Sequence, residues 1–304
     1  MNLFSRFFGQ SDADDRGANK DLIANSIEHP LSLQLLFPEY VALDPKQLVK
    51  EFKSFHPSMK KVRCELDPEL GKDGKAFGLI GWGDHVIRLV GFDLPMPKEA
   101  VELCIAPAHY PQDLKAKARS HRAHLLLYYV GNDSSPVEQY VALAATAGVL
   151  ARFGAIVVLN ESAHTSFPAA ALSGIDSEED MLDLLRTLPL PILFCGFVKH
   201  EVHGVRGVWM RTYGAQLLGL PDLAAHAKGH HEGERYFGIF DNIFKYLEDS
   251  EARIGPGQTM QIEQDEYLRF RSPSSEEDFL VSEGELLVVE TIRADQINRG
   301  KRSR

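Results

Sequence analysis

The stretch from Val208 to Met260 decides the fold of the C-terminal half, and it reads VWMRTYGAQLLGLPDLAAHAKGHHEGERYFGIFDNIFKYLEDSEARIGPGQTM. It begins as an aromatic strand, turns at residues 218–221, passes through a connector rich in His and Gly, and continues as a helix over residues 234–251. Large apolar residues recur in that helix at the spacing of one face, namely Tyr236, Ile239, Phe240, Ile243, Phe244 and Leu247. Each contributes about 1.5–3 kcal/mol when fully buried, so the pattern predicts a helix that anchors the core of a C-terminal sheet.

Strand and helix patterns also alternate through the rest of the chain. Strands are expected at 31–37, 61–66, 76–80, 85–92, 124–130, 155–159, 192–199, 205–212, 260–270 and 278–292. Helices are expected to begin at Asp44 and Ser135, because Asp or Ser before Pro makes a good helix start. Two more are expected to begin at Pro97 and, with an acidic first turn, at Asp176. The predicted fold class is α+β, with two sheet-plus-helix layers of similar strand-helix-strand-hairpin-helix-strand order. That similarity suggests a pseudo-repeat, although no residue-level repeat is present, and a single sheet shared by both halves is the alternative.

Four segments are predicted from this order. Residues 1–27 form a flexible leader, 28–133 an N-terminal α+β domain, 134–292 a C-terminal α+β domain, and 293–304 a disordered basic tail. The boundary is expected in the polar stretch 131–135, where a strand pattern ends and a helix start follows.

Composition limits the possible functions. The 304 residues carry a net charge of -10, with 44% hydrophobic and 25% charged residues. An acidic protein is a poor general binder of nucleic acid, because binding to phosphates needs a basic surface. The odd number of widely spaced cysteines, 3 in all, favours a reducing compartment over a disulfide framework. A cytoplasmic location is therefore expected, and no signal peptide is apparent.

The apolar run of residues 141–159 is long enough to cross a bilayer. It divides at Arg152–Gly154, however, into an Ala/Leu-rich part and a β-branched part. A buried helix, a Gly stop and a buried strand explain it better than a membrane span, so no transmembrane segment is predicted.

The His-rich connector is the candidate metal site. His226 and His230 would share one face of a helix, with Glu234 one turn further on, and these residue types bind zinc. Gly229 and Gly233 interrupt the segment and disfavour a helix. A solvated loop without metal is the leading interpretation, so no cofactor is predicted, and zinc at His226, His230 and Glu234 is the alternative.

Two features are candidates for contact with a partner. The basic residues Lys115, Lys117, Arg119 and Arg122 lie close together in an otherwise acidic chain and offer a surface for an acidic partner or a phosphate. Trp82 falls at a turn between two strands, where a tryptophan can anchor an interface. The competing interpretations are the solvated end of a helix for the basic residues and a ring folded back on the core for Trp82.

The C-terminal half resembles a bacterial family known as domain of unknown function 4261. The resemblance covers about 205–290 and rests on Trp209-Met-Arg-Thr212 with Gly214, on Leu218-Gly-Leu-Pro-Asp222, on the helix 236–247 and on Gly257-Gln-Thr259. It implies a bacterial origin and supplies no catalytic residue. The motif glycines suit turns in which a side chain would clash, and Pro221 with Asp222 suits a helix start.

These observations favour a non-enzymatic function. No P-loop, Rossmann fingerprint or GxSxG motif is present in the sequence. The leading hypothesis is a protein-binding module of an immunity-like or regulatory kind, which recognises another bacterial protein. The alternatives are a metal-dependent hydrolase that uses the His-rich connector and a structural subunit of a larger assembly. The sequence does not predict the oligomeric state.

Overall fold

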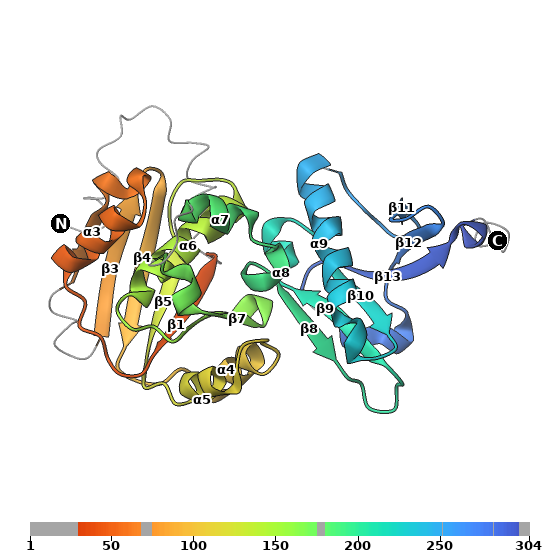
Figure 1. Cartoon of the computed structure of the whole chain (residues 1–304), viewed down its shortest axis with the longest axis horizontal. Helices are drawn as coiled ribbons and strands as arrows, with labels where there is room; N and C mark the ends of the chain where they lie inside the picture. Colours follow the sequence, from red (N-terminus) through yellow and green to blue (C-terminus); the bar gives the residue numbers. More distant parts are fainter. Residues whose placement is uncertain (1–29, 68–74, 175–179, 251, 282, 298–304) are drawn as a thin grey trace. The chain divides into compact units, whose positions relative to one another are not determined.

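The computed structural model describes residues 30–67, 75–174, 180–250, 252–281 and 283–297. The leader predicted at 1–27 and most of the tail predicted at 293–304 lie outside them. The fold is α+β, with one seven-stranded and one six-stranded sheet among the described residues (Figure 1). Contacts divide the chain into two compact units. The first holds the described residues up to Glu161 together with those of Ser166–Leu188, and the second holds Ser162–Thr165 and the described residues from Pro189 onward.

The division between the two units comes later in the sequence than the boundary expected at 131–135. The helix that follows this point, α6 (Pro136–Ala151), packs on the strands of the first sheet and on α3 (Pro45–Phe55). All side chains from Tyr140 to Leu150 are buried. A helix that is apolar on every side must be covered on every side, so α6 belongs to the unit that precedes it.

The first sheet has the order β2-β3-β4-β5-β1-β6-β7. Its strands are β1 (Ser32–Phe37), β2 (Arg63–Leu66), β3 (Lys75–Trp82), β4 (His85–Phe92), β5 (Ala123–Tyr129), β6 (Val157–Asn160) and β7 (Thr165–Pro168). Strand β1 lies between β5 and β6 and pairs antiparallel with both. The helices α4 (Lys98–Ile105), α5 (Gln112–Arg119) and α7 (Met181–Thr187) and the 3-10 turns η1 (Pro57–Lys61) and η4 (Ala169–Leu172) complete this unit.

Most of the elements of this unit were predicted from the sequence. The Asp44 side chain caps α3 by accepting from the Gln47 N–H, and Ser135 caps α6 by accepting from the Glu138 N–H. After α6 the chain turns through Gly154 at φ 95° and enters β6. No helix among the described residues has the length and apolar character needed to cross a membrane.

The second sheet has the order β11-β12-β13-β10-β9-β8. Its strands are β8 (Gly196–His200), β9 (Val208–Tyr213), β10 (Asp222–Ala227), β11 (Thr259–Gln261), β12 (Glu266–Arg271) and β13 (Leu286–Arg293). Here the first strand in the sequence is at an edge, whereas β1 is inside the first sheet, so the similar order of elements in the two halves does not extend to sheet topology. The unit also contains α8 (Leu190–Leu193), α9 (Gly233–Ser250), η5 (Ala215–Leu218), η6 (His230–Glu232) and η7 (Ser275–Leu280).

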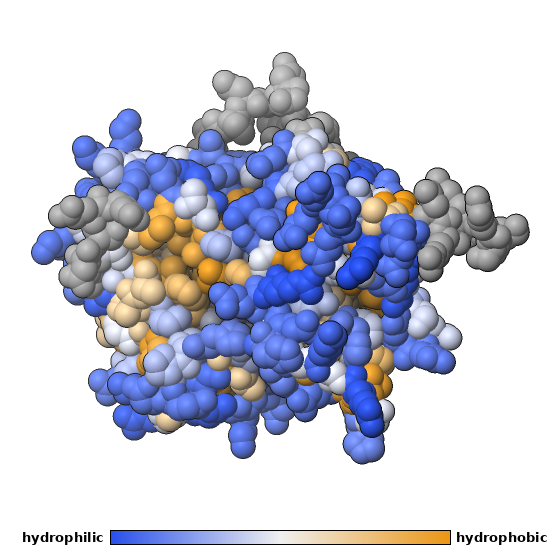
Figure 2. Space-filling model, turned by 45° about the vertical axis from the view of Figure 1, so that its right-hand side comes forward, coloured by the Kyte–Doolittle hydropathy of each residue, from blue (hydrophilic) through white to orange (hydrophobic). Residues whose placement is uncertain are grey.

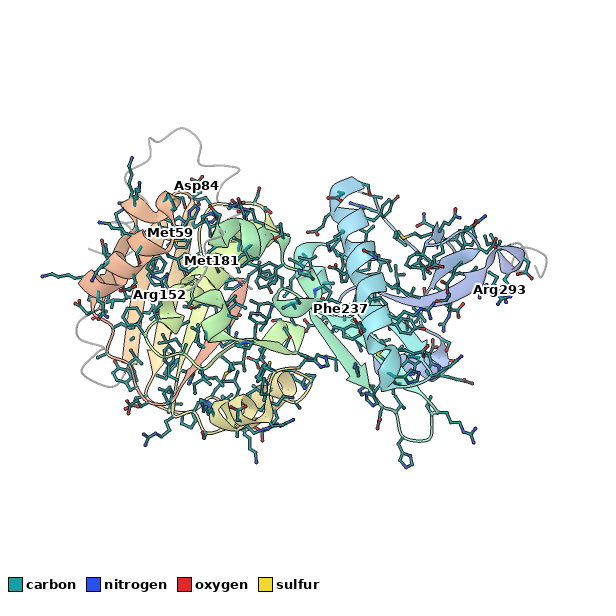
Figure 3. The ribbon with its side chains drawn as sticks, viewed as in Figure 1. Met59, Asp84, Arg152, Met181, Phe237 and Arg293 are labelled. Carbon is teal, nitrogen blue, oxygen red and sulfur yellow. The ribbon has the colours of Figure 1, made fainter. Side chains whose placement is uncertain are left out.

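Helix α9 lies across β9 and β10 (Figure 1), as its periodicity predicted. Phe240, Phe244 and Leu247 are buried. The Phe197 ring on β8 meets the rings of Phe237 and Phe240 with centroid distances of 5.6 and 5.9 Å, and Figure 3 labels Phe237 on this helix. Phe197 is paired with Thr212 across the sheet, so the side chains of Trp209 and Arg211, at alternate positions, lie on the opposite face.

Three local expectations in this unit were wrong. Asp222 begins strand β10 and not a helix, and the supposed connector is a buried central strand up to Ala227. Residues 190–193 are helical, so the strand expected from 192 begins at Gly196. The strand expected over 278–292 starts only at Leu286, because η7 occupies 275–280. For β10, burial hides the two-residue alternation that distinguishes a strand. In the other two cases an apolar run that looked like the start of a strand is a short helical turn.

The face of the molecule shown in Figure 2 is mostly polar. Hydrophilic residues cover most of the face in Figure 2, and hydrophobic residues gather in separate patches between them. The exposed large apolar residues belong to different elements, among them Leu103 on α4, Leu184 on α7 and Tyr246 on α9.

Candidate functional site

The second sheet splits between β10 and β13. These strands run parallel, but only Asp222–Ala224 and Leu286–Val288 are paired. Beyond these positions β10 stays with β9 up to Ala227, while β13 stays with β12 up to Arg293. In open sheets ligands bind preferentially outside the carboxyl ends of parallel strands. A cavity of about 580 Å³ lies at this place, and we refer to it as the fork pocket.

One wall of the fork pocket is aromatic. Trp209 and His226 are paired in register on β9 and β10, and their ring centroids are 5.2 Å apart. Phe279 of η7 meets the Trp209 ring edge-on at 5.9 Å. Tyr236 of α9 also lines the cavity, and its hydroxyl donates to the His226 carbonyl oxygen over 3.4 Å. Trp209 is only 5% exposed, and its Nε1–H has no acceptor among the described residues.

Another part of the lining is ionic. The Arg271 guanidinium donates to both carboxylate oxygens of Glu277 over 2.6 and 2.7 Å. Its Nε donates to Glu290 over 2.6 Å, and Arg269 donates to the other oxygen of Glu290. These contacts follow from the sheet, because register pairs Arg269 with Glu290 across β12 and β13. The result is a chain of alternating charges along one side of the pocket.

The arginines keep these carboxylates ionised. The hydrogen bond from Arg271 lowers the pKa of Glu277 to about 2. Burial acts to raise the pKa of Glu290, but the hydrogen bonds from Arg271 and Arg269 outweigh it and the pKa is lowered. Groups with such low pKa values act as fixed charges near neutral pH and not as proton carriers.

A buried carboxylate supports the base of the split. Asp222, the first residue of β10, is 1% exposed, and its Oδ1 accepts from the Thr212 hydroxyl and the Ala215 N–H, each over 3.1 Å. The Thr212 hydroxyl in turn accepts from the Leu223 N–H over 2.8 Å. After the end of β9 the chain turns through Gly214 at φ 85°, a conformation that favours glycine. Asp222 therefore joins the end of β9 to the start of β10.

Part of this site lies in a segment that matches a protein-family model. Residues 211–282 match the family model described as Domain of unknown function (DUF4261). The match lies within the resemblance expected at 205–290, and it contains Asp222, His226, Tyr236, Arg271 and Glu277 of the split and its pocket. The description of DUF4261 names no activity. Neither the curated proteins nor the solved structures gave a significant match to the chain.

The three predicted zinc ligands lie on three different elements of the structure. His226 is on a strand, where its Nε2 lies 2.7 Å from the Arg206 carbonyl oxygen. His230 is in η6, with its Nε2 2.7 Å from Glu201, and Glu234 is in the first turn of α9. The helix face that His226 and His230 were to share is absent, because β10 and η6 have different periodicities. Within the described ranges, no three or more His, Cys, Asp or Glu side chains are grouped to hold a metal ion.

Three of the four basic residues predicted as an interaction surface are hydrogen-bonded within the chain. Lys115 is buried and its Nζ donates to the Ala106 carbonyl over 2.9 Å. Arg119 makes two hydrogen bonds to Glu102, over 2.7 and 2.9 Å. Arg122 donates to the Pro38 carbonyl over 3.1 Å, and Lys117 is exposed.

The Trp82 ring is buried, whereas an interface anchor would be exposed. It is 6% exposed and packs on Phe52 and His85, with ring centroids 5.7 and 5.6 Å away. Its position agrees with the competing interpretation of a ring folded back on the core. An interaction site at Trp82 or at the basic residues stays a prediction.

Sequence reasoning missed most of the fork pocket. Arg269, Arg271 and Glu290 alternate on two strands, but their pairing depends on register between segments about twenty residues apart. Phe279 was assigned to a strand and is in a 3-10 turn. The available signal was the unusual sequence Glu266–Arg271, in which charges alternate with Tyr267, Leu268 and Phe270.

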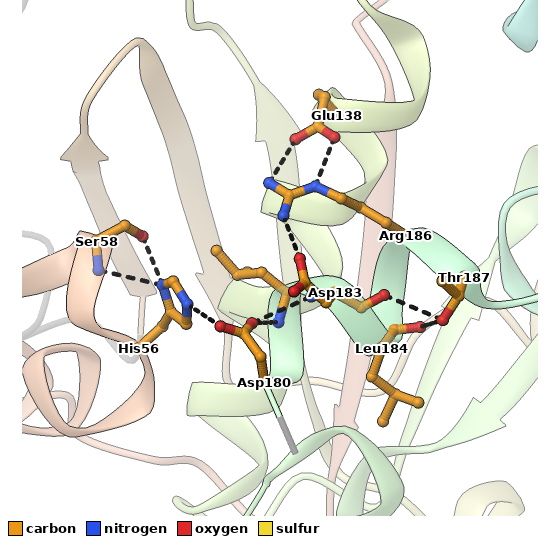
Figure 4. Close-up of polar contacts among 9 residues, drawn as sticks. His56, Ser58, Glu138, Asp180, Asp183, Leu184, Arg186 and Thr187 are labelled. Atoms are coloured by element: carbon orange, nitrogen blue, oxygen red, sulfur yellow. Dashed lines mark hydrogen bonds and ion pairs between the residues drawn. The ribbon is translucent and has the colours of Figure 1, made fainter.

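A Ser, a His and an Asp also meet in the first unit (Figure 4). The His56 Nδ1 accepts from the Ser58 N–H over 3.1 Å, and its Nε2 lies 2.7 Å from Asp180. Asp180 caps α7 by accepting from the N–H groups of Leu182 and Asp183 over 2.9 and 3.1 Å. Both residues thus cap a helix start, His56 for η1 and Asp180 for α7. We interpret this contact as a structural connection between two helical turns.

Proposed function

We propose that this chain is a protein-binding module of an immunity-like or regulatory kind, and that the fork pocket receives a segment of a partner protein. The partner is another bacterial protein, and binding takes place in the cytoplasm. The observation that supports this proposal is the pocket itself. Its volume of about 580 Å³ falls in the range of roughly 300–1,000 Å³ that binding pockets occupy. It opens at the split between β10 and β13, and part of its lining lies in the segment that matches DUF4261.

The residue types of the pocket favour recognition. Trp, Tyr and Arg are the residues that most often supply binding energy at protein interfaces, and Trp209, Tyr236 and Arg271 line this cavity. The Arg271–Glu277 contact uses both carboxylate oxygens, which holds the ionic wall in one geometry. A preformed wall lowers the entropic cost of binding.

Photocrosslinking in the native bacterial host tests the proposal. A benzoylphenylalanine placed at Phe279 should crosslink a distinct partner, because this ring lines the pocket. The matched control is the same probe at Leu184, an exposed apolar residue on α7 in the other unit. Trp209→Ala should reduce the Phe279 adduct, provided that thermal melting shows the variant to be folded.

Other outcomes would oppose the proposal. Equal adducts from positions 279 and 184, or none from 279, would contradict pocket recognition. A product of twice the chain mass from 279 would instead support the structural-subunit alternative.

A further inference from the structure

We infer that the fork pocket takes a lysine or arginine side chain of an extended partner segment, an inference that rests on the proposed function. The proposed function names the place of binding, and this inference names the chemical class of the group that binds there. Three observations carry it: the charge of the lining, the saturation of its arginine, and the aromatic wall.

The lining is acidic. Glu276, Glu277 and Glu290 contribute three carboxylates to it, and Arg271 contributes one guanidinium. Glu277 and Glu290 are balanced by Arg271 and Arg269. The Glu276 carboxylate is exposed, and it makes no hydrogen bond or ion pair to any residue that the structure describes. It therefore adds to the lining a carboxylate that no described arginine balances.

The lining arginine has little capacity for an anion. Its Nε donates to Glu290, its Nη2 to Glu277, and its Nη1 to Glu277 and to the Ser272 carbonyl. Four of its five N–H groups are thereby used, counting one bond for each. A carboxylate or phosphate ligand would have to displace Glu277 or Glu290 before Arg271 could bind it. A cation meets no such obstacle, because carboxylate oxygens accept further hydrogen bonds.

The aromatic wall suits the same occupant. The rings of Trp209, Phe279 and Tyr236 line the cavity. Lys and Arg side chains combine an apolar stem, which packs on such rings, with a cationic head that is attracted to ring faces and carboxylates. The Trp209 Nε1–H is buried without an acceptor among the described residues, and a peptide carbonyl of the partner would supply one. An extended segment offers both a basic side chain and that carbonyl.

Fluorine NMR on the full chain labelled with 5-fluorotryptophan tests the inference. The sequence has 2 tryptophans, so Trp82 serves as an internal control, and Trp82→Phe assigns the two signals. The probes are four acetylated and amidated pentapeptides, Gly-Gly-X-Gly-Gly, in which X is Lys, Arg, norleucine or Glu. The Lys and Arg peptides should shift the Trp209 signal saturably and leave the Trp82 signal in place, with affinity that falls as salt increases.

Two variants sharpen the test. Glu276→Gln should weaken the Lys and Arg peptides roughly twofold to fivefold, as expected for a partly exposed ion pair. The matched control is Glu263→Gln, an exposed carboxylate of the same unit outside the fork pocket, which should change nothing.

The outcomes separate this inference from the proposed function. If the norleucine or Glu peptide shifts Trp209 as strongly as the Lys peptide, the pocket binds peptides and the preference for a cation is wrong. If no peptide shifts the Trp209 signal while position 279 still crosslinks a partner, the inferred preference for a cationic side chain is wrong. The proposed function of the pocket then stands. If neither experiment gives a signal, both are overturned.

Discussion

At the scale of single residues, Asp222 lies in the segment that matches the DUF4261 model and contributes to the geometry of the pocket. It is part of the Leu-Gly-Leu-Pro-Asp motif, and it is buried at the start of β10. Its Oδ1 holds Thr212 and Ala215, whereas its Oδ2 accepts no hydrogen bond within the described part of the chain. The motif aspartate therefore has a structural role at the base of the split, and Trp209 and Arg271 face the pocket instead.

Burial should make stability depend on the protonation of Asp222. Burial raises the pKa of its carboxyl to about 6, from an ordinary value of 3.8, against the hydrogen bonds from Ala215 and Thr212. The unfolded chain therefore loses its proton first as pH rises. The free energy of unfolding should fall between about pH 4 and pH 6, by about 3 kcal/mol in total, and level off above that.

The substitution Asp222→Asn isolates this effect, because the amide oxygen keeps both hydrogen bonds and cannot titrate. Urea unfolding followed by Trp209 fluorescence in a Trp82→Phe background, from pH 4 to pH 7, measures it. The difference in the free energy of unfolding between the chain with Asp222 and the Asp222→Asn variant should change with pH over that window. A constant difference would show that the carboxyl is not perturbed by burial.

At the scale of elements, the glycines of α6 and α9 have opposite surroundings, one crowded and one open. An ideal Cβ at Gly148 of α6 would lie 2.2 Å from the Leu172 carbonyl oxygen in η4, whereas one at Gly238 of α9 would meet no heavy atom within 4 Å. Gly148 thus permits the close approach that buries α6 completely, while Gly238 lies where α9 has open space beside it.

Alanine at these two positions should have opposite effects. Ala is favoured over Gly in a helix by about 1 kcal/mol, so Gly238→Ala should stabilise the second unit by about 0.5–1 kcal/mol. At Gly148 the backbone carbonyl must move, and overpacking of this kind costs about 1–3 kcal/mol, which exceeds the helix gain. Thermal or urea unfolding of both variants checks the signs, and a stabilised Gly148→Ala chain would contradict the packing described for α6 and η4.

At the scale of the whole molecule, the second unit is not continuous in sequence. Ser162–Thr165 belong to it although the residues on either side belong to the first unit. The His164 ring lies on the Tyr213 ring at 4.1 Å, and the Thr165 hydroxyl donates to the Ile192 carbonyl over 3.3 Å. His164 adopts φ 50°, which is uncommon for a residue other than glycine, so packing on Tyr213 must help to hold it.

A fragment that starts at Pro189 should therefore be incomplete. It lacks residues 162–165, of which His164 packs on Tyr213 and Thr165 donates to Ile192, so β8 and β9 should lose amide protection against hydrogen exchange. Helix α9 packs through Phe240 on Phe197 inside the fragment and should keep most of its protection. Hydrogen exchange of residues 189–304 beside the full chain measures both regions, and equal protection of β9 in the two would show that 162–165 add nothing.

The sequence by itself determined the elements whose signals are local. The caps at Asp44 and Ser135, the period of α9 and the division of 141–159 into helix and strand all depend on residues within a few positions of one another, and the family resemblance likewise rests on short motifs. Only the tertiary structure decided that β10 is a central strand and that it parts from β13. The physical reason is that this pairing joins segments about sixty residues apart, and register across such a distance depends on burial and backbone hydrogen bonding that no local pattern specifies.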